Sequence, residues 1–186
     1  TAPTGQRIEG DDLNGLTSVV LSELAFWGGK KEDLPAVYPR LKMYWDNLNY
    51  KSWTPGGTAW SAAYISYVLT RVDPQFPKSS GHYYYAASAK KKKGNWSLFA
   101  TRNSNQIKAQ IGDVLVKARS GKPTNTHGDA VYKIEDGKAW LTGGNLGNTA
   151  KGNVTLALEA SQNYATYGSY EVILKKNGRV VPLASV

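Results

Sequence analysis

The 186-residue chain contains no cysteine. This absence excludes disulfides, thiolate metal sites and cysteine catalysis, but it does not identify the compartment. Long apolar runs are also missing, and none approaches the roughly 20 residues that a helix needs to cross a bilayer. Histidine is scarce, with two copies at His82 and His127. A zinc site at His127 and Asp129 would want a third protein ligand and finds no third histidine, so we expect no metal and no cofactor.

The overall composition is that of an ordinary globular protein. Hydrophobic residues make up 41% and charged residues 20%, and a chain of this length fits one domain over residues 1–186. The chain begins "TAPTGQ", without an initiator Met or an apolar signal core, so we expect a mature or trimmed product. Lys and Arg outnumber Asp and Glu by 23 to 14, which favours polyanionic partners such as cell wall, anionic lipid or nucleic acid.

The first part of the chain, about 11–94, has helical patterns. Apolar residues recur at three and four between Asp11 and Trp27, where glycines end the pattern. Further helices are predicted near 41–48, at 60–72 and within 79–94.

The second part, about 112–176, alternates apolar and polar residues as strands do. The "EDG" at 135–137 predicts a hairpin turn between two of these strands. Helices followed by an antiparallel sheet describe an α+β fold. The predicted strands lie at 113–118, 129–135, 138–142, 153–159 and 169–176.

Three polar residues fall where a nucleophile, a base and an orienting group would be needed. Ser61 lies in the first turn of the helix after "GGTAW", and His127 lies just ahead of a strand. Asn145 lies near the end of the next strand and is the expected partner of His127. Asp129 shares a face with His127, but a separation of about 7 Å along the strand is long for a hydrogen bond, so Asp129 is an alternate partner. His82 is a further alternate, although beside three tyrosines it reads first as a packing residue.

The order of these segments carries a resemblance. "GGTAWSAAYISYVL", "IGDVLV", "THGDAVYKI" and "GGNLGN", over residues 56–148, resemble the NlpC-type and CHAP-type cell-wall hydrolases, which have a papain-like fold. The resemblance is closest to an uncharacterised family with Trp-Ser-Ala at the nucleophile and Ser-x-x-His further on, matched by "SSGH" at 79–82. The chain departs from the pattern in its serine, and at Gly143, where CHAP enzymes tend to place an acidic residue.

The resemblance implies a papain-like α+β domain with N-terminal helices packed on an antiparallel sheet. It implies Ser61 as nucleophile, His127 as base and Asn145 as the third residue, with Trp60 and Tyr64 lining the cleft. The expected function is a peptidase or amidase that acts on peptidoglycan, in the periplasm or outside the cell, and an immunity or inhibitor protein is a further candidate partner.

The serine leaves three interpretations open. A helix N-terminus and an imidazolium can ionise a cysteine but not an alcohol, so Ser61 would have to give its proton to histidine during attack. The chain is therefore a working serine hydrolase, a natural pseudoenzyme that binds peptidoglycan without cleaving it, or an enzyme whose cysteine was deliberately replaced. Nucleic-acid binding is a weaker alternative, because the aromatic residues are scattered and read as core and cleft lining.

Overall fold

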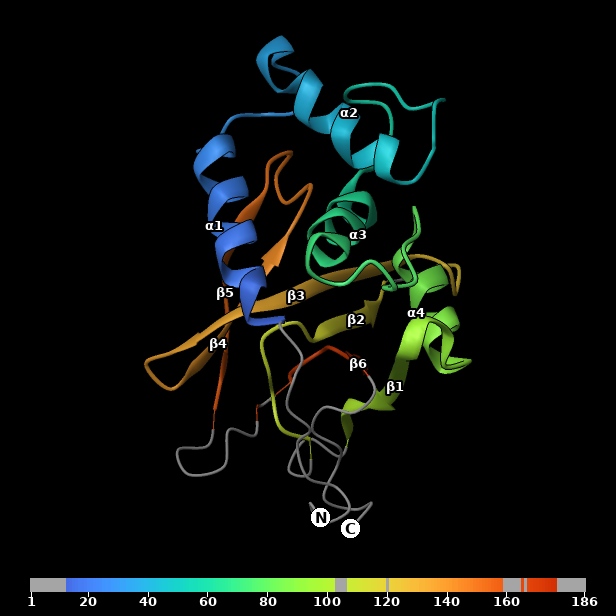
Figure 1. Cartoon of the computed structure of the whole chain (residues 1–186), viewed down its shortest axis with the longest axis vertical. Coiled ribbons are helices and arrows are strands. Elements are labelled where there is room, and N and C mark those ends of the chain that lie inside the picture. The colour runs from blue at the N-terminus through green and yellow to red at the C-terminus, as the bar shows by residue number, and fades with distance from the viewer. Residues whose placement is uncertain (1–12, 103–106, 120, 159–164, 166, 177–186) are drawn as a thin grey trace.

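A computed structural model describes residues 13–102, 107–119, 121–158, 165 and 167–176. The fold is α+β, with the α-helices in the first half of the chain and a six-stranded antiparallel sheet whose strands all lie in the second half (Figure 1). This class and this sheet confirm the expectation from the sequence.

The helices begin and end close to the predicted positions. Leu16–Trp27 ends at Gly28, whose left-handed φ of 49° suits a residue without a side chain. Asp11, where that helix was expected to begin, lies outside the described residues. The helices are α1 (Leu16–Trp27), α2 (Tyr38–Asn47), α3 (Ser61–Val72) and α4 (His82–Lys90), with short 3-10 helices η1 (Leu13–Gly15), η2 (Pro35–Val37) and η3 (Lys93–Asn95).

The strand order in the sheet is β1-β6-β2-β3-β4-β5. Strand β3 lies near the middle, pairs with β2 and β4, and brings His127 opposite Lys117. Asp136 and Gly137 both have positive φ in the turn between β3 and β4, as the predicted hairpin requires. The strands are β1 (Trp96–Ala100), β2 (Val114–Ala118), β3 (Thr126–Glu135), β4 (Lys138–Gly143), β5 (Lys151–Ala157) and β6 (Val172–Lys176).

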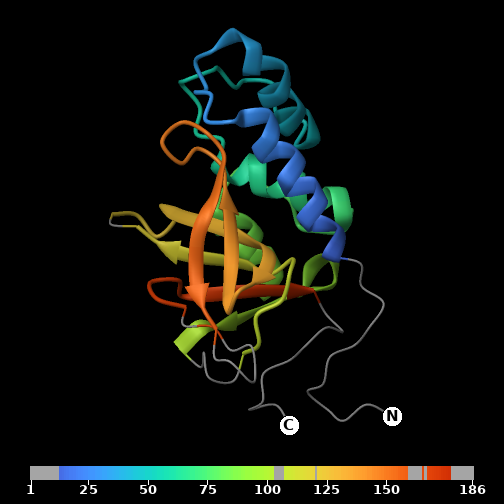
Figure 2. The ribbon, with the colours of Figure 1, turned by 90° about the vertical axis from the view of Figure 1, so that its left-hand side faces the viewer.

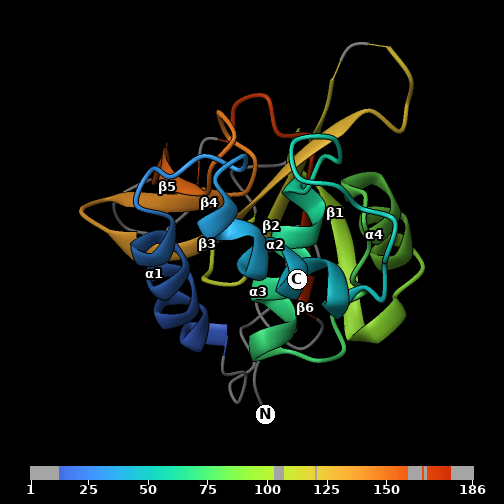
Figure 3. The ribbon, with the colours of Figure 1, turned by 90° about the horizontal axis from the view of Figure 1, so that it is seen from above.

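Each face of the sheet covers a hydrophobic core. Val114 and Ala130 pack under the helices, whereas the neighbouring Leu115 and Val131 belong to a second cluster. This alternation follows from the two-residue period of a strand. Helices α1, α3 and α4 lie in that order across the sheet, as Figure 3 shows, and Figure 2 gives the side view of the helical layer against the twisted strands.

Strand β1 was not predicted from the sequence. Its sequence, WSLFA, contains one polar residue and does not alternate apolar with polar residues, and its five residues pair with β6. Within the described residues, no helix combines the length and the apolar character needed to cross a bilayer.

Candidate functional site

Ser61 is the first residue of α3, and buried aromatic rings hold that end of the helix in place. Trp60 stacks on Trp27 with ring centroids 4.7 Å apart and an interplanar angle of 11°. Its indole N–H donates to Glu32 over 3.0 Å. The first amides of a helix have no intrahelical acceptor, so the Ser61 side chain lies beside free N–H donors and the positive end of the helix dipole.

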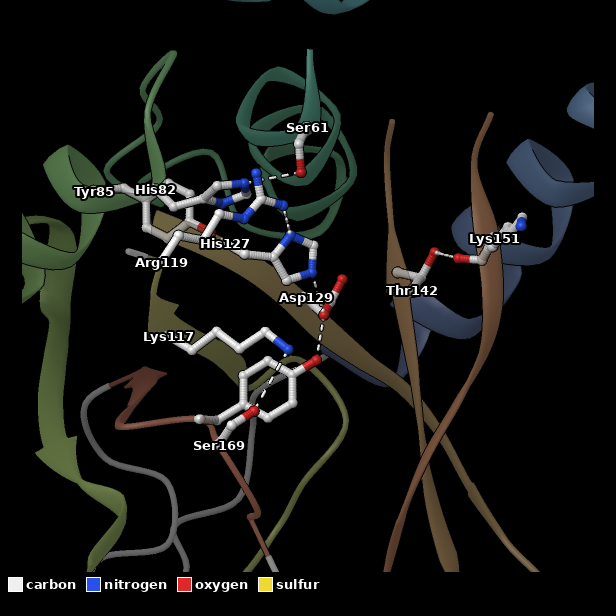
Figure 4. Close-up of polar contacts among 11 residues, drawn as sticks. Ser61, His82, Tyr85, Lys117, Arg119, His127, Asp129, Thr142, Lys151 and Ser169 are labelled. Carbon is white, nitrogen blue, oxygen red and sulfur yellow. Dashed lines mark hydrogen bonds and ion pairs between the residues drawn. The ribbon is translucent and has the colours of Figure 1, made fainter. Parts of the chain in front are cut away.

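The Ser61 hydroxyl bonds a histidine. Its Oγ lies 2.8 Å from Nε2 of His82, which begins α4. On the other side of the ring, Nδ1 lies 2.5 Å from the hydroxyl of Tyr85, one turn further along the same helix. Ser61, His82 and Tyr85 therefore form a continuous hydrogen-bonded chain, drawn in Figure 4.

His82 is held neutral. Burial lowers the pKa of His82 to about 3, with further contributions from the neighbouring His127 and Arg119. A neutral imidazole has one N–H and one lone pair. When Nδ1 holds the proton and donates to Tyr85, the lone pair on Nε2 accepts the Ser61 hydroxyl, which is the arrangement a general base needs. Burial also raises the pKa of Tyr85, so this phenol stays protonated.

A second chain of polar contacts centres on His127. Its Nε2 lies 2.7 Å from Oδ2 of Asp129, and its Nδ1 lies 3.1 Å from the guanidinium of Arg119. Because arginine can only donate, Nδ1 must be the lone pair and Nε2 must hold the proton that goes to the carboxylate. The Tyr170 hydroxyl also donates to Oδ2 of Asp129. The carboxylate thus fixes the tautomer of His127 and turns its basic nitrogen toward Arg119 and Ser61 (Figure 4).

Gly128 lies between the hydrogen-bonded group of His82 and the hydrogen-bonded group of His127. It lies between His127 and Asp129 on β3, so it faces the opposite side of the strand from both. A Cβ at this position would lie 2.3 Å from the Tyr85 hydroxyl and 2.5 Å from Nδ1 of His82. The missing side chain lets His82 pack against the strand, and the two histidine rings come within 5.8 Å between centroids.

Gly143, the position that departs from the CHAP pattern, lies against Asp129. A Cβ on Gly143 would lie only 2.1 Å from Oδ1 of Asp129. That oxygen is buried and has no hydrogen-bond partner within the described chain. The carboxylate of Asp129 therefore occupies the space into which a side chain at position 143 would point. The carboxylate that bonds His127 therefore comes from Asp129 on β3, and not from an acidic residue at position 143 on β4.

A pocket of about 200 Å³ opens beside Ser61. It is bordered by the start of α3, the start of α4, the end of the β2–β3 hairpin and the turn after β4. Its lining residues are Ala59, Ser61, Ala62, Ser80, Gly81, His82, Arg119, Thr124, Asn125, Thr126 and Asn145.

Two of the expected contacts do not form. The expected hydrogen bond between Ser61 and His127 is absent from the described residues. The Ser61 hydroxyl bonds His82 instead, and Nδ1 of His127 bonds the guanidinium of Arg119. Asn145 does not orient His127, because β4 ends at Gly143 and Asn145 lies in the turn beyond it with a φ of 56°. Asn145 instead lines the pocket.

Asp129 takes the orienting position. The expectation that it would lie too far from His127 was wrong, because it rested on the spacing along the strand. Two side chains on one face lean together and close that gap to 2.7 Å.

Trp60 and Tyr64 are core residues and do not line the pocket, contrary to expectation. Trp60 is 1% exposed and Tyr64 is 0% exposed. The Tyr64 hydroxyl bonds Thr142 on β4 over 2.9 Å, which ties α3 to the sheet. A Cβ at Gly144 would lie 2.5 Å from the Cβ of Tyr64, so the turn after β4 packs directly on this helix. Both residues therefore hold the start of α3 in the core and do not contact the pocket.

Sequence reasoning missed Arg119 and Tyr170 as parts of the site and ranked His82 low. The "SSGH" segment was the available signal for His82, because it places the histidine at a helix start. No local pattern predicted Arg119 or Tyr170, since their contacts depend on how β2 lies between β3 and β6 in the sheet. Within the described ranges, no group of three or more His, Asp or Glu side chains could hold a metal ion.

A sequence comparison places the chain in a family. The family described as "Uncharacterized protein conserved in bacteria (DUF2272)" matches residues 23–133, more than half of the chain, and the chain belongs to it. The matched range includes Ser61, His82, Arg119, His127 and Asp129, but ends before Asn145 and Tyr170. A search of curated proteins found no match to the chain.

Proposed function

We propose that this DUF2272 protein is a hydrolase that cleaves a peptide or amide bond of peptidoglycan with Ser61 as its nucleophile. The observation that carries the proposal is the 2.8 Å hydrogen bond between Ser61 Oγ and His82 Nε2 at the edge of an open pocket. A hydroxyl paired with a neutral imidazole is the basic unit of serine acyl transfer. The net charge of +9 suits an anionic polymer as substrate.

The proposed reaction has two halves. Ser61 Oγ attacks the carbonyl carbon while its proton passes to Nε2 of His82, and the N–H of Ser61 donates to the oxyanion. The C–N bond then breaks, the leaving amine takes the proton from His82, and an ester remains on Ser61. In the second half, water gives a proton to His82 and its oxygen attacks the ester. The acid product leaves, and the proton returns to Ser61.

His127 has a supporting position in this scheme. Its orientation resembles that of a papain-like site, with one nitrogen on a carboxylate and the other turned toward the nucleophile. We therefore propose that the α+β fold is papain-like, with Ser61 at the position of the catalytic cysteine of NlpC-type and CHAP-type enzymes and Asp129 in place of the expected third residue. A protein that acts on peptidoglycan would work in the periplasm or outside the cell.

The test is mass spectrometry of purified peptidoglycan after incubation with the protein. We expect soluble fragments that carry a new amine and a new carboxyl end, with the mass of one added water. The Ser61→Ala variant should release none, and Ser52→Ala, which changes an exposed serine, should act like the wild type. Peptidoglycan that is unchanged by the wild-type protein would overturn the proposal.

A second candidate function is binding to peptidoglycan without cleavage. The low pKa of His82 favours it, because the burial that keeps the ring neutral also opposes the imidazolium that catalysis must form. A tyrosine supports the ring where serine hydrolases commonly place a carboxylate. Sedimentation with peptidoglycan sacculi that is equal for the wild type and Ser61→Ala, without any released fragment, would favour this function over hydrolysis.

A further inference from the structure

The pocket beside Ser61 has one charged residue in its lining. Arg119 supplies this charge, and the other lining residues that the structure describes are small, polar or the neutral His82. No acidic side chain lines the pocket within the described ranges. A small polar pocket with a single cation favours a ligand with negative charge.

Arg119 is held at the rim by its backbone and reaches inward by its side chain. Its N–H donates to the carbonyl of Asn125 over 2.7 Å, which closes the end of the β2–β3 hairpin. Its guanidinium lies 3.1 Å from Nδ1 of His127, on the side of the ring turned toward Ser61 (Figure 4). The residue itself is exposed, so a ligand entering the pocket can reach it.

The guanidinium of Arg119 has more N–H donors than its bond to His127 uses. A guanidinium carries five N–H groups, and the bond to His127 uses one of them. Within the described chain, none of the ion pairs involves Arg119, and the nearby Asp129 gives its Oδ2 to His127 and Tyr170 instead. The planar fork of arginine matches a carboxylate, which it binds with two parallel hydrogen bonds.

We propose that Arg119 binds a free carboxylate of the substrate next to the bond that Ser61 attacks. The proposal rests on the proposed function and narrows its substrate to a peptidoglycan stem peptide with an unamidated carboxyl group close to the scissile bond. Arg119 is then a specificity residue, because an amidated stem peptide offers the guanidinium no negative charge.

The test measures binding without turnover. The Ser61→Ala protein is titrated with a stem peptide released from peptidoglycan, and with the same peptide after its carboxyl groups are converted to amides. Affinities come from calorimetry or NMR shifts. Two variants are compared in this background: Arg119→Gln, and Lys122→Gln, which removes one positive charge from an exposed residue of the same hairpin outside the pocket lining.

We expect the carboxylate form to bind at least about tenfold more tightly than the amide, since a hydrogen bond from a guanidinium to a carboxylate is stronger than one to a neutral amide. Arg119→Gln should abolish this preference, and Lys122→Gln should keep it. Arg119→Lys, which keeps the charge but loses the fork, should retain part of it.

Equal affinity for the two peptides, binding of neither, or equal losses in Arg119→Gln and Lys122→Gln would overturn the proposal. The outcome is separate from that of the proposed function. Missing hydrolysis leaves a measured carboxylate preference intact, and a missing preference leaves measured hydrolysis intact.

Discussion

Ser61 and His82 meet through a hydrogen bond of 2.8 Å, although they begin two different helices and lie 21 residues apart in the chain. The loop between the helices is held by Ser66 of α3, whose hydroxyl bonds the carbonyl and the N–H of Ser79. This local anchoring brings the start of α4 back to the start of α3. It creates the serine–histidine pair on which the proposed chemistry depends.

Gly128→Ala should disrupt the site from the sheet side. The added Cβ would lie 2.3 Å from the Tyr85 hydroxyl and 2.5 Å from Nδ1 of His82, so both rings must shift. We expect a loss of about 1–3 kcal/mol in the free energy of unfolding, measured by urea denaturation, and a large loss of fragment release from peptidoglycan. Gly15→Ala is the control, because its Cβ would make an ordinary contact of 3.5 Å with Val72. Equal effects of the two substitutions would contradict the tight packing at Gly128.

His82 should make the fold sensitive to acid. Burial lowers its pKa to about 3, whereas the unfolded chain has a histidine pKa of about 6.5. Between these values the unfolded state binds the extra proton, so this contribution to stability is complete above pH 6.5 and falls as pH drops toward 3. Between pH 7 and pH 5 the wild type should lose about 2 kcal/mol of unfolding free energy that His82→Gln does not lose. Denaturation curves at both pH values measure this loss. The same change in unfolding free energy in both proteins would contradict a neutral, buried His82.

The helices and the hairpin were predictable because their signals are local. The apolar spacing of three and four, the glycine after Trp27 and the "EDG" turn act within a few residues, and the structure follows them. The position of Ser61 at the start of α3 belongs to the same class of signal.

The pairing within the site was not predictable in the same way. The sequence identified both histidines but assigned the serine to the wrong one, because the choice depends on the path of the loop before α4 and on the side chain of Arg119. The role of Gly128 likewise appears only when α4 lies against β3. These are packing relationships between distant segments, and no local propensity encodes them.

Ser61→Cys should give a thiol with a pKa below the usual value of about 8.5. The helix N-terminus and the nearby Arg119 both favour the thiolate over the thiol. The measurement is the rate of alkylation against pH. Ser52→Cys, at an exposed position, is the matched control and should titrate near 8.5. If both cysteines titrate alike, the helix N-terminus and Arg119 do not stabilise a thiolate at position 61.

The protein should sediment with peptidoglycan sacculi and be released by salt. Its net charge of +9 attracts an anionic polymer, and exposed charges are screened beyond about 10 Å at 0.1 M salt. Binding is measured by centrifugation across a range of salt concentrations. Binding that is insensitive to salt would point to contacts other than charge.

The central claim, that His82 activates Ser61 as a nucleophile, is tested most directly by labelling with a fluorophosphonate, whose phosphorus is attacked by an activated serine with loss of fluoride. Peptide mass spectrometry should find the label on Ser61, and Ser61→Ala should take up none there. His82→Gln should label at least about 100-fold more slowly, because a positioned general base contributes about 10²–10⁴ in rate. A wild-type protein that stays unlabelled at Ser61, or that labels equally fast without His82, would contradict the account.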